Sequence, residues 1–522
     1  MTAAAAPGLT VTAEQLPPEE TPLRTDVAGL LGRTRRGPRL EPVRVAGWRQ
    51  FQNVFGGLTA DAETPYAARG YFDNGGQVAH VVRLTGSASA TATGQLDLGT
   101  LDAAGMWAAG APARADFAAT SYRIDATSPG AWANGARVDI RYRAEGITSA
   151  PEVDVRVVAR GEAVERFVRV APRDLASTLE RSLLVRLVPL GAEVPATAAT
   201  STGPRSAGWS VTLGHGSDQA PDLTDYLAAA RLLTEVPEVA LIASPDLYPD
   251  LSDATMSDEV IGSLLEASAA ARDRLVVLDV PPARAAAPSA VIWADAVRAG
   301  REDTFRRSGA AYHPRLKVRD PLGGIARPLR EVPASGHVAG VISRLDRERG
   351  AYYSPANASI YEAVDTAAAF AEPEQASLNA AGVNVLRCAS RGGLEVWGAR
   401  TLDLEPEGRF VAHRRLVHRL VRAIRAVAEP LVFETNGPEL RLTFVRSITT
   451  VLLQAYNAGA LKGGRPEEAF RVQCDEANNP PEEVDLGRLV CDIELAPAVP
   501  MEFIHIRLEL NAGGLLEVVE QA

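Results

Sequence analysis

Apolar and polar residues follow two periods along the 522-residue chain, and each period predicts a different kind of element. An apolar residue at every third or fourth position predicts a helix with one buried face. This spacing occurs at 48–55, 66–72, 224–233, 409–428 and 439–458. Alternation typical of half-buried strands occurs at 138–142, 153–157, 489–495 and 503–510. Continuous apolar runs at 239–243 and 275–278, and a shorter one at 27–32, indicate buried strands.

The order of these elements predicts a mixed α/β and α+β fold with several domains. Helices and buried strands alternate after residue 210, which favours a wound sheet, whereas strand patterns dominate 85–210. The chain is also too long for one compact core. The expected parts are an N-terminal arm (1–22), the N-terminal part of a core domain (23–84), a β-rich inserted domain (85–210), an α/β middle domain (211–380), a C-terminal core domain (381–510) and a C-terminal arm (511–522).

Both ends of the chain are predicted to be extended arms. Residues 9–12 can form a strand, and the prolines at 17, 18 and 22 exclude a helix after them. At the other end, the sequence NAGG (511–514) predicts a hinge before an apolar-polar tail. Such segments cannot bury themselves, so they either fray or add a strand to the sheet of a neighbouring chain. The residues expected to link neighbours are Leu9, Val11, Leu515 and Val518.

Composition and charge narrow the class of protein. The formal net charge is −11 and the pI is about 5.4, which argues against nucleic acid as the main partner. Cys388, Cys474 and Cys491 lack metal-site spacing and indicate buried thiols in a reducing compartment. No apolar run is long enough for a membrane span, and the first residues do not resemble a secretory leader. We therefore expect synthesis in the cytoplasm and no membrane insertion.

Motifs for catalysis or cofactor binding are scarce. The sequence lacks a Walker-type phosphate loop, an H-E-x-x-H pair and a G-x-S-x-G elbow, and His413 and His418 are spaced five apart, off a shared helix face. We expect no cofactor. Asp246 and Asp279 each follow a buried strand, where they can hold Mg²⁺ or perform acid/base chemistry. This pair leaves an α/β enzyme as the alternative function, although turn and helix-cap roles are commoner for such residues.

Two further patterns each allow two interpretations. The glycine-rich segment 214–218 precedes a helix, so it can cradle an anion or simply form a turn. Arg415, Arg419 and Arg422 lie on one face of the predicted helix 409–428. That face is either solvated or turned toward an acidic protein partner.

Short motifs in a fixed order resemble those of tail-sheath proteins from contractile phages and phage-tail-like injection systems. The N-terminal motifs are TDVAGLLG (25–32), RGP (36–38), EPVRV (41–45), FQNVFGG (51–57), RGYFDNGG (69–76) and VVR (81–83). The later motifs are YHPRL (312–316), VPASGHVAG (332–340), RLDRERG (344–350), SPAN (354–357), VWGARTL (396–402), RRL (414–416), FETN (433–436), GAL (459–461), PEEAF (466–470) and CD (474–475). The region 85–210 matches poorly, as a variable insertion would.

The resemblance implies a structural sheath subunit that is not an enzyme. Such subunits form six-fold rings that stack helically around an inner tube, and their arms add strands to neighbouring subunits. The implied partners are the chain itself, an inner tube protein, and baseplate and terminal cap proteins. Assembly is expected in the bacterial cytoplasm, as part of a phage tail or a tail-like particle. By the same resemblance, 85–210 faces outward and 381–510 faces the tube.

The tube contact has two candidate surfaces under this resemblance. The first is the predicted helix 439–458 with the residue that follows it, represented by Arg446, Thr450, Gln454, Asn457 and Lys462. The second is the arginine face formed by Arg415, Arg419 and Arg422.

Overall fold

The computed structural model describes residues 24–97, 117, 119–144, 152–162, 164–193, 205–390, 392–431, 434, 436–498, 504–510 and 516–521. The chain forms two compact units. The larger unit comprises residues 25–418, and the smaller unit comprises residues 1–24 and 419–522.

A nine-stranded sheet forms the centre of the larger unit. Its strand order is β16 (Ser359–Ile360), β19 (Leu394–Val396), β18 (Val383–Cys388), β13 (Gly309–His313), β12 (Leu275–Asp279), β11 (Leu241–Ala243), β1 (Ala28–Gly32), β3 (Ala79–Arg83) and β2 (Val43–Val45). The strands from β18 to β3 run parallel, whereas β16, β19 and β2 add antiparallel edges. The parallel strands are almost wholly buried because helices cover both of their faces.

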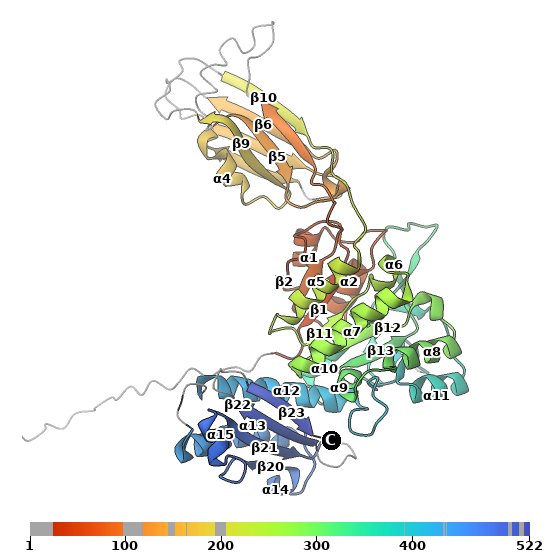
Figure 1. Cartoon of the computed structure of the whole chain (residues 1–522). Helices are drawn as coiled ribbons and strands as arrows, with labels where there is room; N and C mark the ends of the chain where they lie inside the picture. The colour runs from red at the N-terminus through yellow and green to blue at the C-terminus, as the bar shows by residue number, and fades with distance from the viewer. Residues whose placement is uncertain are drawn as a thin grey trace, which may run out of the picture. The chain divides into compact units, whose positions relative to one another are not determined.

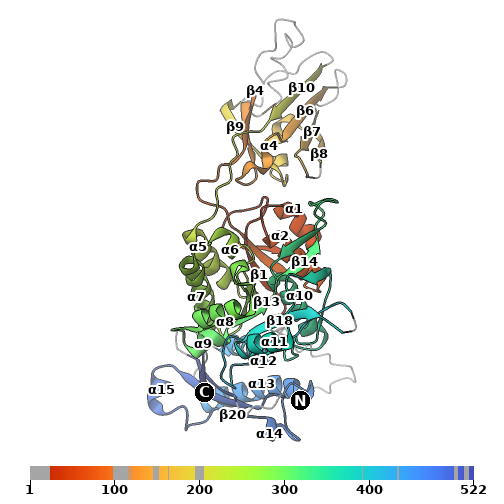
Figure 2. The same ribbon diagram turned by 90° about the vertical axis from the view of Figure 1, so that its right-hand side faces the viewer.

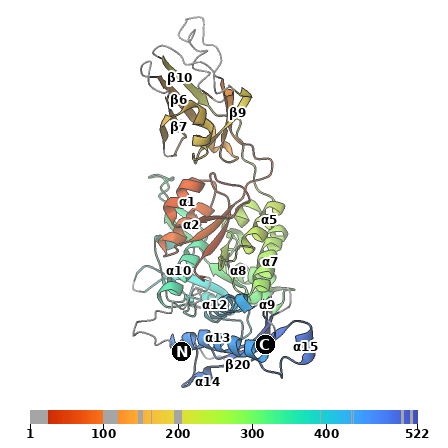
Figure 3. The ribbon, with the colours of Figure 1, turned by 90° about the vertical axis from the view of Figure 1, so that its left-hand side faces the viewer.

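Two pairs of helices provide that cover. Helices α2 (Thr64–Asp73) and α10 (Ser335–Glu348) lie on one face, and α5 (Leu223–Thr234) and α7 (Ala254–Ala271) lie on the other (Figures 2 and 3). Helices α2 and α10 approach closely because α10 carries glycines where they meet. A Cβ on Gly336 would lie 2.2 Å from the carbonyl oxygen of Ala67, and one on Gly340 would lie 2.4 Å from that of Tyr71.

Further elements complete this α/β part. The helices are α1 (Trp48–Phe55), α6 (Leu247–Asp250), α8 (Ala287–Arg298), α9 (Asp303–Arg307) and α11 (Glu372–Ala380), and a separate sheet has the order β15 (Leu329–Val332), β14 (Leu316–Arg319) and β17 (Ala363–Thr366). Local sequence fixes several helix ends. At the start of α5, the carboxylates of Asp222 and Asp225 each accept the other residue's backbone N–H, at 3.0 and 3.2 Å. Helix α1 ends at Gly56, whose φ of 86° suits glycine.

Residues between β3 and α5 form a β-sandwich with its own core. One sheet has the order β10 (Arg205–Thr212), β6 (Arg137–Ala144), β7 (Glu152–Val158) and β8 (Glu165–Val170). The other sheet has the order β4 (Thr93–Asp97), β5 (Ala119–Ala126) and β9 (Val185–Glu193), and α4 (Leu175–Leu179) lies beside it (Figure 1). Tyr122 and Ile124 of one sheet share a buried core with Val138, Ile140 and Val155 of the other.

The smaller unit combines helices with one antiparallel sheet. Helix α12 (Val411–Ala428) begins in the larger unit and ends in the smaller one. The further helices are α13 (Pro438–Asn457), α14 (Pro466–Ala469) and α15 (Pro481–Asp485), and the sheet has the order β20 (Phe470–Gln473), β21 (Leu489–Leu495), β22 (Ile504–Leu510) and β23 (Leu516–Gln521). Helix α13 packs on β20 through its buried face of Phe444, Ile448 and Leu452.

The fold confirms the predicted mixture of helices and strands, arranged in several sheets. The helices expected at 48–55 and 439–458 occur at Trp48–Phe55 and Pro438–Asn457. The boundary expected between residues 380 and 381 falls inside the nine-stranded sheet, because β18 pairs with β13. Among the helices in the described ranges, none has the length and apolarity that crossing a bilayer requires.

Candidate interaction surfaces

The two strand-end carboxylates of the enzyme alternative both cap helices. Asp246 is fully buried after β11 and accepts backbone N–H groups from Arg33 at 2.9 Å, Glu63 at 2.6 Å and Thr64 at 3.0 Å. The last two groups belong to the first turn of α2, which has no partner for them within the helix. Asp279 accepts the N–H of Ser335 at 2.9 Å, at the start of α10. The geometry therefore favours the helix-cap interpretation of both residues over catalysis.

Other ionisable groups surround Asp246 at this edge of the sheet. Asp250 contacts the Arg33 guanidinium at 2.7 Å and accepts the Tyr226 hydroxyl at 2.8 Å. Burial raises the pKa of Asp250 to about 7, although Arg33 opposes the shift. Burial also raises the pKa of Glu63, which is ion-paired with Arg315. Within the described ranges, no three His, Cys, Asp or Glu side chains are grouped so that they could hold a metal ion.

Segment 214–218 runs beside residues 90–93, and Gly214 and Ser217 form isolated antiparallel bridges with Thr93 and Ala90. Gly214 and Thr93 exchange backbone hydrogen bonds at 2.9 and 2.8 Å. The N–H of Ser217 donates to Ala90 at 3.0 Å, and that of Gly216 donates to the Asn134 side chain at 2.8 Å. These hydrogen bonds tie the segment to residues 90, 93 and 134, so the segment forms neither the expected turn nor an anion cradle.

The prediction of a solvent-facing arginine stripe on α12 is wrong for two of its three residues. Arg415 is 1% exposed, forms an ion pair with buried Asp346 and donates to the carbonyl oxygen of Ala240 at 3.2 Å. Arg422 is equally buried and donates to the carbonyl oxygen of Arg24 at 2.7 Å. Only Arg419 of the three is exposed. The second candidate tube surface therefore does not exist as a charged face.

The first candidate tube surface is a continuous exposed stripe along α13. Arg446, Thr450, Gln454 and Asn457 are all exposed, and they recur every three or four residues opposite the buried face. Leu442 extends the stripe and is 52% exposed. Lys462, five residues beyond the end of the helix, is also exposed. This stripe offers polar, basic and apolar groups to a partner.

The predicted arms are described at one end only. Leu9, Val11 and Leu515 lie outside the described residues. Val518 lies in β23, where it is the register partner of Leu508 in β22. In the isolated chain, the C-terminal strand thus covers the edge of its own sheet. Which chain supplies this strand in an assembly stays a prediction.

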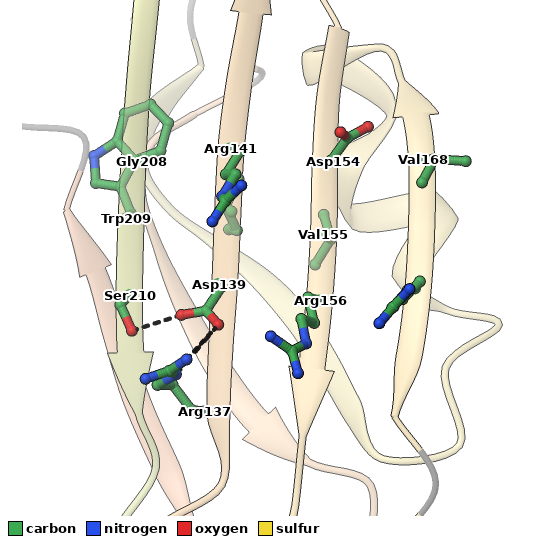
Figure 4. Close-up of a pocket in the computed structure, with 12 residues that line it drawn as sticks. Arg137, Asp139, Arg141, Asp154, Val155, Arg156, Val168, Gly208, Trp209 and Ser210 are labelled. Carbon is green, nitrogen blue, oxygen red and sulfur yellow. Dashed lines mark hydrogen bonds and ion pairs between the residues drawn. The ribbon is translucent and has the colours of Figure 1, made fainter.

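The sandwich carries a further surface that the sequence pattern reveals only in part. A depression of about 540 Å³ on the β10-β6-β7-β8 sheet is lined by Arg141, Arg156 and Arg166. Figure 4 shows Arg141 and Arg156 on neighbouring strands of this sheet. Neighbouring Asp139 forms an ion pair with Arg137 at 3.0 Å and accepts a hydrogen bond from the Ser210 hydroxyl at 2.8 Å. The alternation at 138–142 and 153–157 already places Arg141 and Arg156 on outward positions. The third arginine lies on β8, which falls outside the predicted strands.

Part of the larger unit is similar in sequence to known proteins. Residues 216–402 match the phage tail sheath protein central domain. The tail sheath protein of Vibrio phage KVP40 is 28% identical over 181 residues, which cover 34% of this chain and 26% of that protein. The tail sheath protein of Enterobacteria phage T4 is 26% identical over 189 residues, covering 35% and 28%. The matched segment thus spans about a quarter of these relatives' length.

Solved structures resemble the chain over nearly its whole length. A sheath tail protein from Listeria innocua has a TM-score of 0.63 at 16% identity, covering 93% of this chain and 95% of that one. The helical sheath of the anti-feeding prophage in its contracted state has a TM-score of 0.55 at 21% identity, covering 96% and 98%. At these identities the likeness shows a shared fold. By sequence the chain is thus similar to tail sheath proteins over residues 216–402, and by fold it resembles them over nearly its whole length.

Proposed function

We propose that the chain is the structural sheath subunit of a contractile, phage-tail-like injection system. Subunits polymerise as stacked hexameric rings around an inner tube, and the sheath contracts to drive the tube through a target envelope. The observation that carries the proposal is the tail sheath central domain at 216–402, set in a fold that resembles sheath proteins almost end to end. Baseplate and terminal cap proteins are the further partners, and assembly takes place in the bacterial cytoplasm.

The antiparallel sheet of the smaller unit supports a strand-exchange link between subunits. Strand β23 is the last in its sheet and is joined to β22 through residues 511–515. Its pairing consists of main-chain hydrogen bonds, which a second copy of the chain can supply equally well. Head-to-tail exchange of this kind is heterologous, and it generates an open helical assembly when the successive rotations do not close into a ring. The same strand can therefore close its own sheet in a free subunit and join two subunits in the sheath.

Electron microscopy of the purified protein tests the proposal. The full chain is expressed alone, and stained particles are examined over a range of salt concentration and pH. Striated hollow tubes with six-fold end views are the expected result. Monomers or small closed oligomers under all conditions, and no ordered assembly when the inner tube protein is added, would contradict it.

A truncation after Gly514 tests the strand exchange separately. The truncated chain retains both cores, so the larger unit is expected to unfold at an unchanged temperature while ordered tubes fail to form. A synthetic peptide with the sequence LLEVVEQA (515–522) serves as the control. Added in excess, it should occupy the vacant edge of β22 without linking subunits. Tubes formed by the truncated chain would remove strand exchange and leave the sheath proposal intact.

A further inference from the structure

Two of the three cysteines lie opposite each other in the smaller unit. Strands β20 and β21 are antiparallel, and their register runs from Phe470 opposite Leu495 to Gln473 opposite Asp492. One more step along this register brings Cys474 opposite Cys491. Both side chains lie on the buried face of the sheet, with exposures of 8% and 0%. The third cysteine, Cys388, is exposed and belongs to the larger unit.

Residues directly opposite in an antiparallel pair are separated by little more than a disulfide requires. Their Cβ atoms are typically about 4.5–5.5 Å apart, and a disulfide brings Cβ atoms to about 3.5–4.5 Å. Cys474 lies just beyond Gln473, the last paired residue of β20, so closing the remaining gap breaks no hydrogen bond of the strand pair. Joining the two sulfurs therefore requires a small local movement and no change of register.

The two thiols also interact in the reduced state. The Cys491 thiol donates toward the Cys474 sulfur, which lowers the pKa of Cys474. The side-chain amide of Asn479 points at the same sulfur, 3.9 Å away. Cys474 is therefore the better nucleophile of the pair, and Cys491 is placed to attack it second. Cys388 lies beside Asp365 instead, and partial desolvation of its sulfur together with that carboxylate raises the pKa of Cys388.

We propose that Cys474 and Cys491 form a cross-strand disulfide that joins β20 to β21 when the protein meets a small-molecule disulfide such as oxidised glutathione. The Cys474 thiolate attacks one sulfur of the oxidant and releases one molecule of reduced thiol. Cys491 then loses its proton and attacks the Cys474 sulfur of the mixed disulfide, releasing the second thiol. Two protein thiols are oxidised, and one oxidant disulfide is reduced to two thiols.

The bond would brace the sheet that carries the C-terminal strand. Strand β21 pairs with β20 on one side and with β22 on the other, and β22 in turn pairs with β23. A disulfide between Cys474 and Cys491 closes a loop between β20 and β21. It would stabilise the folded sheet, because it reduces the conformational entropy of the unfolded chain. The pair would stay reduced in the cytoplasm and oxidise in a released particle, a sequence of events that rests on the proposed function.

Mass spectrometry of the oxidised full chain tests the bond itself. A Cys388→Ser variant removes the exposed thiol, and the protein is equilibrated with oxidised glutathione and then digested with trypsin. Cleavage at Arg471, Arg488 and Arg507 places the two cysteines on different peptides, 472–488 and 489–507. These peptides are expected as one linked species that reductant separates. The oxidised smaller unit should also unfold several degrees higher than the reduced one.

Single cysteine variants test whether the linked peptides come from a bond between Cys474 and Cys491. Cys474→Ser and Cys491→Ser, each in the Cys388→Ser background, should lose the linked species and the rise in unfolding temperature. Stable glutathione adducts on Cys474 without a link to Cys491 would overturn the proposal. So would two thiols that remain fully alkylatable after unfolding, under conditions that oxidise Cys388 in the parent chain. Because these readouts need no assembled particle, a failure of the sheath proposal would leave them unaffected.

Discussion

Three backbone N–H groups donate hydrogen bonds to the Asp246 carboxylate. These bonds explain why this polar side chain can be buried with no exposure to solvent. Two of the donors begin α2, so the helix dipole adds to the hydrogen bonds. The donors lie 182 to 213 residues away in the sequence. A local pattern therefore cannot distinguish this carboxylate from a metal ligand. The strand-end position of Asp246 and Asp279 was predictable, but their partners depend on how distant segments pack.

Removal of the Asp246 carboxylate should destabilise the larger unit. Asp246→Ala leaves the buried N–H groups of Arg33, Glu63 and Thr64 without an acceptor, at a cost of about 2–4 kcal/mol. Asp246→Asn keeps one oxygen acceptor and should cost less. Urea unfolding monitored by tryptophan fluorescence measures both. Asp253→Ala is the control, because Asp253 caps α7 at an exposed site and should cost only about 1 kcal/mol. Equal stability of all three variants would contradict the buried-cap assignment.

The ionisation of Asp250 should make the larger unit less stable as pH rises. Burial raises the pKa of Asp250 from 3.8 to about 7, so the folded chain holds this proton over a range in which the unfolded chain has lost it. The free energy of unfolding contributed by Asp250 therefore falls between those two pH values. Asp250→Asn removes this contribution. Unfolding curves measured across the range should show a flatter pH dependence in the variant, and an unchanged dependence would rule out Asp250 as the source.

Among the elements, a helix with one apolar and one polar face was predicted closely. A helix that buries charged side chains was not. Helix α13 has one buried stripe and one exposed stripe, so its period showed both its bounds and its exposed residues. The apolar stripe of α12 was equally clear, but periodicity assigns every polar residue to solvent. Arg415 is instead buried because Asp346 of α10 supplies a counter-charge from another part of the sequence. Such pairing depends on tertiary packing.

The arginines that line the depression on the β10-β6-β7-β8 sheet should slightly lower the stability of the sandwich. Arg156 and Arg166 are directly opposite in the register of β7 and β8, and like charges in that position repel. Arg166→Glu turns the repulsion into attraction and should stabilise the sandwich by about 0.5–1 kcal/mol. Arg181→Glu, an exposed change outside this strand pair, alters the net charge equally and serves as the control. A thermal melt at low salt measures the difference. Equal melting temperatures for the two variants would show that the opposed arginines do not repel measurably.

At the scale of the whole molecule, charge is distributed unevenly along the chain. The segment 85–215 has thirteen arginines, no lysine and thirteen acidic residues, so the net charge of −11 resides entirely in the rest of the sequence. Against this acidic background, Arg446 and Lys462 are basic groups on the exposed α13 surface. A partner with acidic groups would find complementary charge there, and opposite charges at an interface mainly guide and orient association. The surface thus fits the proposed tube contact better than α12 does.

Charge reversal on this surface should separate tube binding from sheath formation. In Arg446→Glu/Lys462→Glu, both positions remain exposed and the buried face of α13 is unchanged, so the chain should fold and assemble with itself. Co-sedimentation with purified inner tube should fall at least tenfold, and binding by the parent chain should weaken as salt is added. Arg471→Glu reverses an exposed charge on β20 and should leave binding intact. If the double variant binds the tube as well as this control does, the tube contact lies elsewhere. If the double variant no longer assembles with itself, the α13 surface forms contacts between sheath subunits.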